Sequence, residues 1–350
     1  MVPSVPHTFI LITTHLVSPF WLLLARRQLN FRRKARMFWD TTPSFHWRQI
    51  EKPLFGWVRT IERIICSQRP PEMSGPIVNI FSDYSGDTKR SDYHVISVLY
   101  LDVHASAEWE LRRRVIRQRY LADGRRISFK ALGDRQRQSA LVPFLQAANE
   151  IEGICITLAI RKSIKVLCSD MNVSGFLQND LAFESKWKQR PFENMLLVTH
   201  LISVLVAGMS KPRQHIYWVS DEDALFANLA RSRDLGQMLS RFTSYYVKQE
   251  LGELGVGTTS MDEGDRYEED LAAIPDLAAG AIAEVATRLS TAVGGVIRTG
   301  VALPFYGSLS PKTEFISSWL ADGTQRLRRV VVLFERSGEK AFTVSRFNIG

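Results

Sequence analysis

The run Gly153–Ile160 reads G-I-C-I-T-L-A-I and contains no charged residue over the length of one β-strand. A strand that is apolar on both faces has to be covered on both faces, as inner strands of helix-flanked sheets are. Together with the helical periodicities elsewhere in the chain, this run predicts an α/β fold in which helices flank the sheet.

Further strands are expected on both sides of this run. Ile77–Ser82 and Tyr93–Leu101 are joined by the polar turn Asp83–Asp92, which predicts a hairpin. The remaining expected strands are His215–Ser220, a short one at Ile127–Phe129, and a last hairpin made of 328–334 and 341–347.

Helices are expected between these strands. The segments are 105–120, 135–151 with an interruption near Pro143, 194–209, a helix from Ala224, and a helix that Pro275-Asp276 opens. The Gly- and acid-rich segment 251–270 is expected to be a mobile linker.

The first 76 residues differ from the rest. Phe9–Ala25 is apolar, and a basic cluster follows it, as in a membrane anchor with a cytoplasmic flank. At about 17 residues, with His15 and Pro19 inside it, this run is at the lower limit for a membrane span. A basic, helical N-terminal extension over 1–76 is therefore preferred to an anchor. The proline-rich loop at 67–76 is expected to separate it from a domain over 77–350.

The composition of the chain indicates which classes of molecule it can bind and which kinds of site it lacks. The net charge of +9 and the pI of about 9.6 favour a polyanion such as nucleic acid, DNA or RNA. Cys66, Cys155 and Cys168 are far apart, which argues against disulfides and a structural zinc site and favours the cytoplasm. The sequence has neither a G-x-x-x-x-G-K-[ST] nor a G-x-S-x-G motif, which removes P-loop and hydrolase-elbow chemistry.

Four carboxylates lie at the ends of expected elements: Asp83 after the first strand, Asp221 and Asp223 after a late strand, and Asp276 in a first helical turn. Acids that converge at one sheet edge repel each other unless cations neutralise them, and hard oxygen ligands select Mg²⁺ or Mn²⁺. Two such ions can activate water and stabilise the leaving oxygen in phosphodiester hydrolysis.

The order of elements, and four short motifs in it, resemble a widespread bacterial RNase H-like family of unknown function. S-D-Y-S-G-D at 82–87 is similar to that family's D-E-S-G-D opening, and I-P-D-L-A-A-G at 274–280 to its A-D-L-x-A-G helix. I-S-F-K at 127–130 and I-Y-W-V-S-D at 216–221 resemble its middle segment and its late acid-tipped strand. The resemblance covers about 77–295. It implies an RNase H-like mixed sheet, with Asp83, Asp221 and Asp276 as catalytic metal ligands of a nuclease.

Two departures support an alternative function. Tyr84 replaces the family's second acid, and Arg161-Lys162 ends the strand 153–160 where many RNase H-like nucleases carry an acid. If that strand neighboured the first, Asp221 would lie one strand further out. The alternative is a catalytically inactive RNase H-like scaffold that binds nucleic acid or a protein partner and is tethered to a membrane through residues 9–25.

Each acid also has an ordinary structural interpretation. Asp83 suits a turn, Asp221 or Asp223 can cap the following helix, and Asp276 can complement a helix dipole. A third interpretation is the sugar-kinase and actin-like ATPase class, whose first hairpin carries an acid, a glycine and a threonine, as Asp83, Gly86 and Thr88 do. That class needs a second phosphate loop and an adenosine loop, which the sequence does not offer convincingly.

Overall fold

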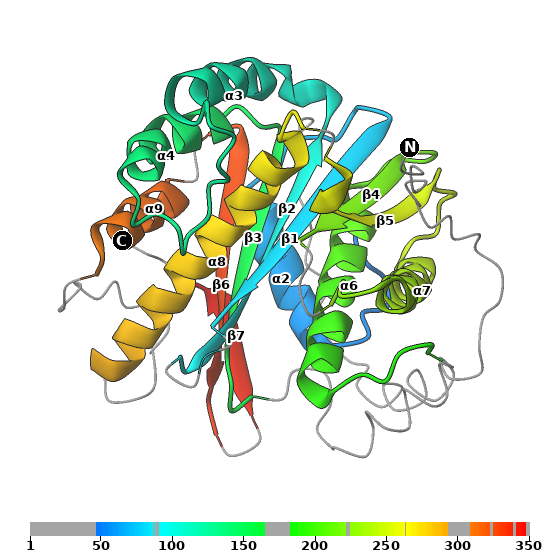
Figure 1. Ribbon diagram of the computed structural model, residues 1–350. Helices are drawn as coiled ribbons and strands as arrows, with labels where there is room; N and C mark the ends of the chain where they lie inside the picture. Colours follow the sequence, from blue (N-terminus) through cyan, green and yellow to red (C-terminus); the bar gives the residue numbers. More distant parts are fainter. Residues whose placement is uncertain are drawn as a thin grey trace.

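The computed structural model describes residues 47–86, 88, 91–164, 183–221, 225–262, 264–292, 309–322, 325–338 and 341–347 (Figure 1). Within them, seven strands form one sheet in the order β5-β4-β1-β2-β3-β6-β7. The strands are β1 Ile77–Ser85, β2 Tyr93–Asp102, β3 Gly153–Arg161, β4 His215–Ser220, β5 Leu254–Thr258, β6 Leu327–Arg336 and β7 Phe342–Arg346. The run 153–160 is indeed an inner strand, and all eight of its residues are buried.

The strand directions are those of an RNase H-like mixed sheet. β1, β2 and β3 are successive antiparallel neighbours, and β4 and β5 run parallel to β1 on its other side. β6 and β7 extend the sheet beyond β3, with β6 parallel to β3 and β7 antiparallel to β6. Because β2 separates β3 from β1, the basic end of β3 does not displace β4 from the side of β1. The predicted α/β, RNase H-like fold is confirmed.

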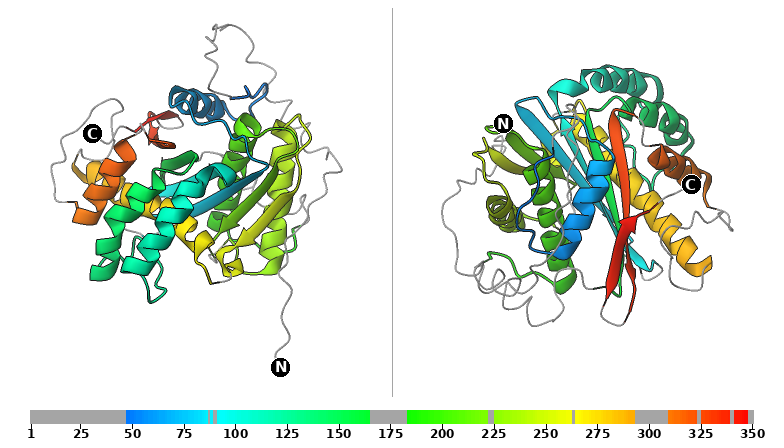
Figure 2. Two further views of the ribbon diagram at one scale, coloured as in Figure 1. Left: turned by 90° about the horizontal axis from the view of Figure 1, so that it is seen from above. Right: turned by 180° about the vertical axis from the view of Figure 1, so that it is seen from behind.

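Helices cover both faces of the sheet (Figures 1 and 2). They are α2 Gly56–Ser67, α3 Ala107–Tyr120, α4 Arg135–Ala148, α6 Gln189–Met209, α7 Leu229–Tyr246, α8 Tyr267–Ala292 and α9 Pro311–Ala321. Alternate strand residues face two separate cores: Val78 and Ile80 pack with α2, α6 and α7, whereas Phe81 packs with α3, α4, α8 and α9. The view from behind in Figure 2 shows α2 lying across the face opposite α8.

Helix α8 crosses β1 and β2 at close range, and its small residues explain why. Ala278, Ala279 and Gly280 are part of a run of alanine and glycine on the helix. A Cβ on Gly280 would lie 2.2 Å from Cγ of Phe129, so only glycine lets this loop residue pack on the helix. The same stretch of α8 carries Asp276, and the packing therefore places this acid at the sheet.

Three local predictions were wrong. The segment 251–270 is not a linker, because it contains β5, a 3₁₀ turn over Thr259–Met261 and the start of α8. α8 begins at Tyr267 instead of Pro275, with Glu268, Glu269 and Asp270 in a first turn where acids complement the helix dipole. The segment 127–129 is not a strand, since it lies in the loop between α3 and α4 and bonds to α8 instead of to the sheet.

Other boundaries also differ from the prediction. α7 begins at Leu229 instead of Ala224, which itself lies outside the described residues. Pro143 lies inside α4, which ends at Ala148 instead of continuing to residue 151. The final hairpin of β6 and β7 is confirmed.

The described part of the N-terminal segment packs into the core. Trp57, Ile61 and Ile65 of α2 are buried in the core that α6 and α7 share. The carboxylate of buried Glu62 accepts hydrogen bonds from the backbone N–H of Ile50 at 2.9 Å and from the indole of Trp47 at 3.2 Å. The run 9–25 lies outside the described residues, and the domain boundary near residue 76 stays a prediction.

Helix α6 is long enough and apolar enough to span a membrane. It is the one such helix in the part of the chain that the structure describes, and 89% of its most apolar 18-residue stretch is buried inside the fold. Burial in the core of the domain therefore accounts for its apolar sequence.

Candidate functional site

Asp83, Asp221 and Asp276 line one cavity of about 470 Å³. Asp83 belongs to β1, Asp221 follows the last residue of β4, and Asp276 lies on α8. β1 and β4 are parallel and in register, with Ser82 opposite Ser220, so the two acids that follow lie at the same end of the sheet. β1 itself continues to Ser85, beyond the predicted end at Ser82, and Asp83 is still paired with β2. The structure thus brings together three of the four acids that the sequence singled out. Asp223, like Asp87, lies outside the described residues.

The side chain of Asp83 points to the α8 side of the sheet. It has the same parity along β1 as Phe81, which packs in the α8-side core, and its carboxyl hydrogen-bonds that of Asp276. Tyr84 points the other way, as strand alternation requires, packing against the α6-side core with its hydroxyl 3.3 Å from that of Ser82. Tyr84 therefore does not replace a ligand on the Asp83 side of the strand, although it borders the cavity.

The pair of Asp83 and Asp276 is electrostatically unfavourable when both are ionised. Burial raises the pKa of Asp83 well above its ordinary value, and the charge and hydrogen bond of Asp276 and the charge of Asp221 raise it further. Asp276 also accepts a hydrogen bond of 2.7 Å from the backbone N–H of Phe129. A cation bound between the two carboxyls would offset their repulsion and replace the hydrogen bond between them.

Asp221 is neutralised differently. The guanidinium of Arg126 donates to both of its oxygens, with Nη1 at 2.7 Å from Oδ1 and Nη2 bonded to Oδ2. Thr259 Oγ1 donates to Oδ1 at 2.8 Å. A bidentate guanidinium satisfies a carboxylate in both charge and geometry, so Asp221 is held in an ion pair although it lines the same cavity as the other two acids.

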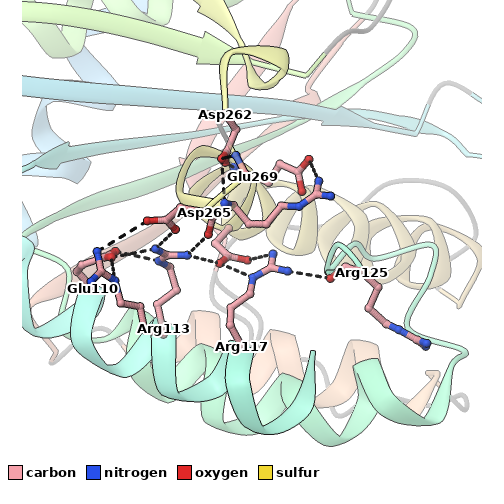
Figure 3. Close-up of polar contacts among 11 residues, drawn as sticks. Glu110, Arg113, Arg117, Arg125, Asp262, Asp265 and Glu269 are labelled. Atoms are coloured by element: carbon pink, nitrogen blue, oxygen red, sulfur yellow. Dashed lines mark hydrogen bonds and ion pairs between the residues drawn. The ribbon is translucent and has the colours of Figure 1, made fainter. Parts of the chain in front are cut away.

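Arg126 and Phe129 belong to the 121–134 loop, which joins α3 to α4. The loop is fixed from several elements: Arg137 Nε donates to the carbonyl of Arg126 at 2.6 Å, and Lys312 Nζ to that of Phe129 at 2.7 Å. Arg117 Nη1 donates to the carbonyl of Arg125 at 3.0 Å (Figure 3). The loop is therefore a built part of the cavity wall, and it sets where Arg126 lies.

The arginines of α3 that face inward form a buried ion-pair cluster with the start of α8. Arg113 Nη1 lies 3.1 Å from Oδ2 of Asp270, and Arg117 Nη2 lies 2.5 Å from its Oδ1. Figure 3 shows Arg113 and Arg117 extending side by side from α3, with Glu110 beside Arg113 on the same helix and Asp265 above it. These two arginines hold α3 against α8 and are structural.

Basic residues also line the cavity. Lys130 comes from the 121–134 loop and Arg190 from the first turn of α6, and both face the same space as Arg126. Sequence reasoning missed Arg126 and Arg190. Arg126 directly precedes the I-S-F-K stretch at 127–130, so the motif pointed to the right loop, but nothing local to it indicated a partner 95 residues away.

The residues present fit one divalent cation better than two. Among the described residues no group of three or more His, Cys, Asp or Glu side chains is placed to hold a metal ion. Asp83 and Asp276 supply hard oxygen donors in contact with each other, which suits Mg²⁺ or Mn²⁺. Asp221, the third expected ligand, has both oxygens engaged by Arg126.

Comparisons with known proteins give no assignment: no protein-family model matches the chain, and a search of curated proteins returns no match. The site therefore has to be interpreted from its own geometry.

Proposed function

We propose that this chain is a metal-dependent nuclease, a hydrolase that cleaves phosphodiester bonds of nucleic acid in the cavity around Asp83 and Asp276. The observation that carries the proposal is the contact between these two carboxyls in a cavity that also presents basic side chains. A folded protein gains no stability from two adjacent buried acids, so their presence in a cavity favours a function that needs a cation there. The RNase H-like sheet supports it, because Asp83 lies near the end of β1 and Asp276 on the helix that packs against that strand.

In this proposal, separate residues of the cavity bind the cation and the phosphate group. Asp83 and Asp276 would hold the cation, and a bound Mg²⁺ or Mn²⁺ supplies an activated water and stabilises charge on the phosphoryl and leaving oxygens. Lys130 and Arg190 line the cavity as cations that can bind non-bridging phosphate oxygens. The buried backbone N–H of Phe129 fixes one oxygen of Asp276 and thereby orients this acid.

One cation is proposed in place of the two that the acid count alone predicts. Arg126 brings a fixed positive charge to Asp221, where a second metal ion would otherwise bind. A guanidinium can stabilise developing charge on a phosphoryl group, as arginine does in other phosphoryl-transfer sites. Unlike a bound metal ion, it cannot dissociate from the protein. The positive charge of the whole chain, +9, favours the approach of a polyanion. Cytoplasmic location remains part of this proposal.

A second candidate is the inactive RNase H-like scaffold. The observation that favours it is the bidentate ion pair of Arg126 with Asp221, which removes one carboxylate from the set that RNase H-like nucleases use. Such a scaffold would bind nucleic acid or a protein partner without cutting, and would need no metal.

Cleavage assays separate the two candidates. The full chain is incubated with labelled single- and double-stranded DNA and RNA in Mg²⁺, in Mn²⁺ and in EDTA. Asp83→Asn and Asp276→Asn should each abolish metal-dependent cleavage. Asp265→Asn, which removes an acid outside the cavity, should leave cleavage unchanged. Cleavage that survives both cavity substitutions would sink the nuclease proposal, and metal-independent binding without cleavage would favour the scaffold.

A further inference from the structure

A second cavity of about 390 Å³ lies beside the acid cavity, and Arg190 lines both. It forms where β2 begins and β3 ends: Tyr93 is paired with Arg161, and the backbone N–H of Lys162 donates to the carbonyl of Asp92 at 2.9 Å. Nothing in the proposed catalytic step uses this space. The shared arginine makes the two cavities neighbours along the surface.

The described residues that line the second cavity are all polar. Its cations are Arg161, Lys162 and Arg190, and its hydroxyls are Thr88, Ser91 and Ser163. Among the described residues one carboxylate lines it, that of Asp92, which accepts a hydrogen bond of 2.9 Å from Ser290 Oγ. Behind the wall, Glu335 holds Arg161 through Nε at 2.8 Å. Three cations against one lining acid and one acid behind them leave the site positive.

These contacts also fix where the cations are. Arg161 donates from Nη2 to Ser290 Oγ at 3.2 Å in addition to its bond with Glu335, so its guanidinium cannot swing away. Lys162 Nζ donates to the carbonyl of Thr88 at 2.7 Å, which keeps its ammonium at the cavity wall. Arg161 also lies over the ring of Tyr93, 5.4 Å from its centroid, but no aromatic side chain is among the described residues that line the cavity. Cations and hydroxyls of this kind recognise phosphate and sugar and do not read bases.

The acid cavity has a different lining. Tyr84, Phe129, Pro191 and Leu225 give it apolar and aromatic walls that a base or sugar can contact, beside the acids and cations. An extended nucleic-acid strand alternates bases with phosphates, so it would meet these two kinds of surface in turn. We propose that the second cavity binds a backbone phosphate of the strand whose scissile phosphodiester occupies the acid cavity, with Arg190 contacting the backbone between the two.

The strand as ligand rests on the proposed nuclease function, so binding is measured apart from cleavage. A fluorescein-labelled single-stranded oligonucleotide is titrated with the full chain in EDTA, and anisotropy is followed from 50 to 300 mM NaCl. Lys162→Gln should weaken binding about three- to tenfold at the lowest salt and reduce the slope of log K against log salt by about 0.7. Lys52→Gln makes the same charge change at an exposed lysine that lines neither cavity, and it should alter neither quantity.

A second readout uses substrate size. Bis(4-nitrophenyl) phosphate carries a single phosphate, so a molecule that reacts in the acid cavity has no second phosphate for the neighbouring one. Lys162→Gln should therefore leave its metal-dependent hydrolysis unchanged while raising KM for the oligonucleotide about three- to tenfold. Equal effects on both substrates, or an oligonucleotide effect no larger than that of Lys52→Gln, would overturn the proposal. If the wild-type chain cleaves nothing yet binds the oligonucleotide in a Lys162-dependent way, the nuclease function fails and the phosphate site stands. Absence of any oligonucleotide binding overturns the phosphate site.

Discussion

Helix α8 carries two inward-facing carboxylates, Asp270 and Asp276, whose surroundings are opposite. Asp270 is 1% exposed and receives the guanidiniums of Arg113 and Arg117 from α3. Asp276 meets another carboxyl, that of Asp83. Burial raises the pKa of both Asp270 and Asp83, but the arginines oppose this rise at Asp270, whereas the neighbouring carboxylates add to it at Asp83.

The difference separates a structural acid from a functional candidate on one element. The fold supplies all the positive charge that Asp270 needs, so its cluster stabilises the contact of α3 with α8 without any ligand. At Asp83 and Asp276 the fold supplies a backbone N–H, a second acid and the charge of Arg126, which already pairs with Asp221. Part of the unfavourable charge is therefore left for a proton or a cation to compensate. Strain of this kind, which the surrounding structure tolerates, is typical of binding and catalytic sites.

Removing the structural acid should have the largest effect on stability. Asp270→Asn leaves two guanidiniums without their common carboxylate, and we expect a loss of about 3–5 kcal/mol in the free energy of unfolding. Urea unfolding at neutral pH in EDTA measures it. Asp265→Asn is the control, because Asp265 is 55% exposed and pairs with the same Arg113, so its loss should stay below about 1 kcal/mol. Equal losses in the two variants would contradict the structural role of Asp270.

The pH dependence of stability should have opposite signs for two acids of the site region. Asp83 has a raised pKa in the folded chain, so above the ordinary Asp range the folded state holds a proton that the unfolded chain has lost, and stability falls as pH rises. Asp83→Asn cannot lose this proton. Without metal, it should therefore gain stability relative to wild type as pH rises from about 4 towards 8, by at most about 1.4 kcal/mol per pH unit.

Asp134 provides the contrasting case. The backbone N–H of Gln136, together with Arg125, holds the pKa of Asp134 below its ordinary value. Its contribution to stability is therefore present above the unfolded pKa and lost as pH falls, so the deficit of Asp134→Asn should shrink towards acidic pH. Urea unfolding of both variants between pH 4 and 8 measures the two trends. A gap between Asp83→Asn and wild type that does not change with pH would count against the raised pKa of Asp83.

Metal binding should stabilise the wild-type chain through the acid pair alone. A ligand that binds only the folded state adds about 1.4 kcal/mol at ten times its Kd. Thermal unfolding should therefore move to higher temperature in Mg²⁺ or Mn²⁺, and Asp276→Asn should lose this shift while Asp270→Asn keeps it. A shift of the same size in Asp276→Asn would place the ion elsewhere.

The sequence predicted the parts of this fold in which side-chain pattern decides structure. β1 to β4 and the final hairpin follow from apolar runs and turn residues, and their order predicted that Asp83 and Asp221 would leave the same sheet edge. β5 was missed because Leu254–Thr258 contains two glycines in five residues and is a strand only through its pairing with β4. The start of α8 was missed because Pro275 is also typical of a first helical turn.

The partner of each carboxylate in the site could not be predicted in the same way. Whether Asp221 meets Asp83 or an arginine depends on the path of the 121–134 loop, which contacts from α3, α4, α8 and α9 determine. These contacts join residues far apart in the chain, and no local pattern encodes them. Sequence order therefore indicates which acids converge, and tertiary packing decides which of them stay available to a ligand.

Arg126 gives the smallest expected effect and the sharpest test of this last point. If its ion pair keeps Asp221 away from the acid pair, Arg126→Gln should add Asp221 to the cation site and tighten Mn²⁺ binding about fivefold, or about 1 kcal/mol, by titration calorimetry. In an Asp221→Asn background the same substitution should have a smaller effect, because only the interaction of Arg126 with the charge of Asp276 remains, and this double-variant cycle isolates the contribution of Asp221. Unchanged or weaker Mn²⁺ binding in Arg126→Gln would mean that Thr259 and the end of β4 hold Asp221 in place without the arginine. Asp83 and Asp276 would then be the acids of this cavity that bind the ion among the described residues, fixed by the fold as Asp270 is but without the two guanidiniums that pair with Asp270.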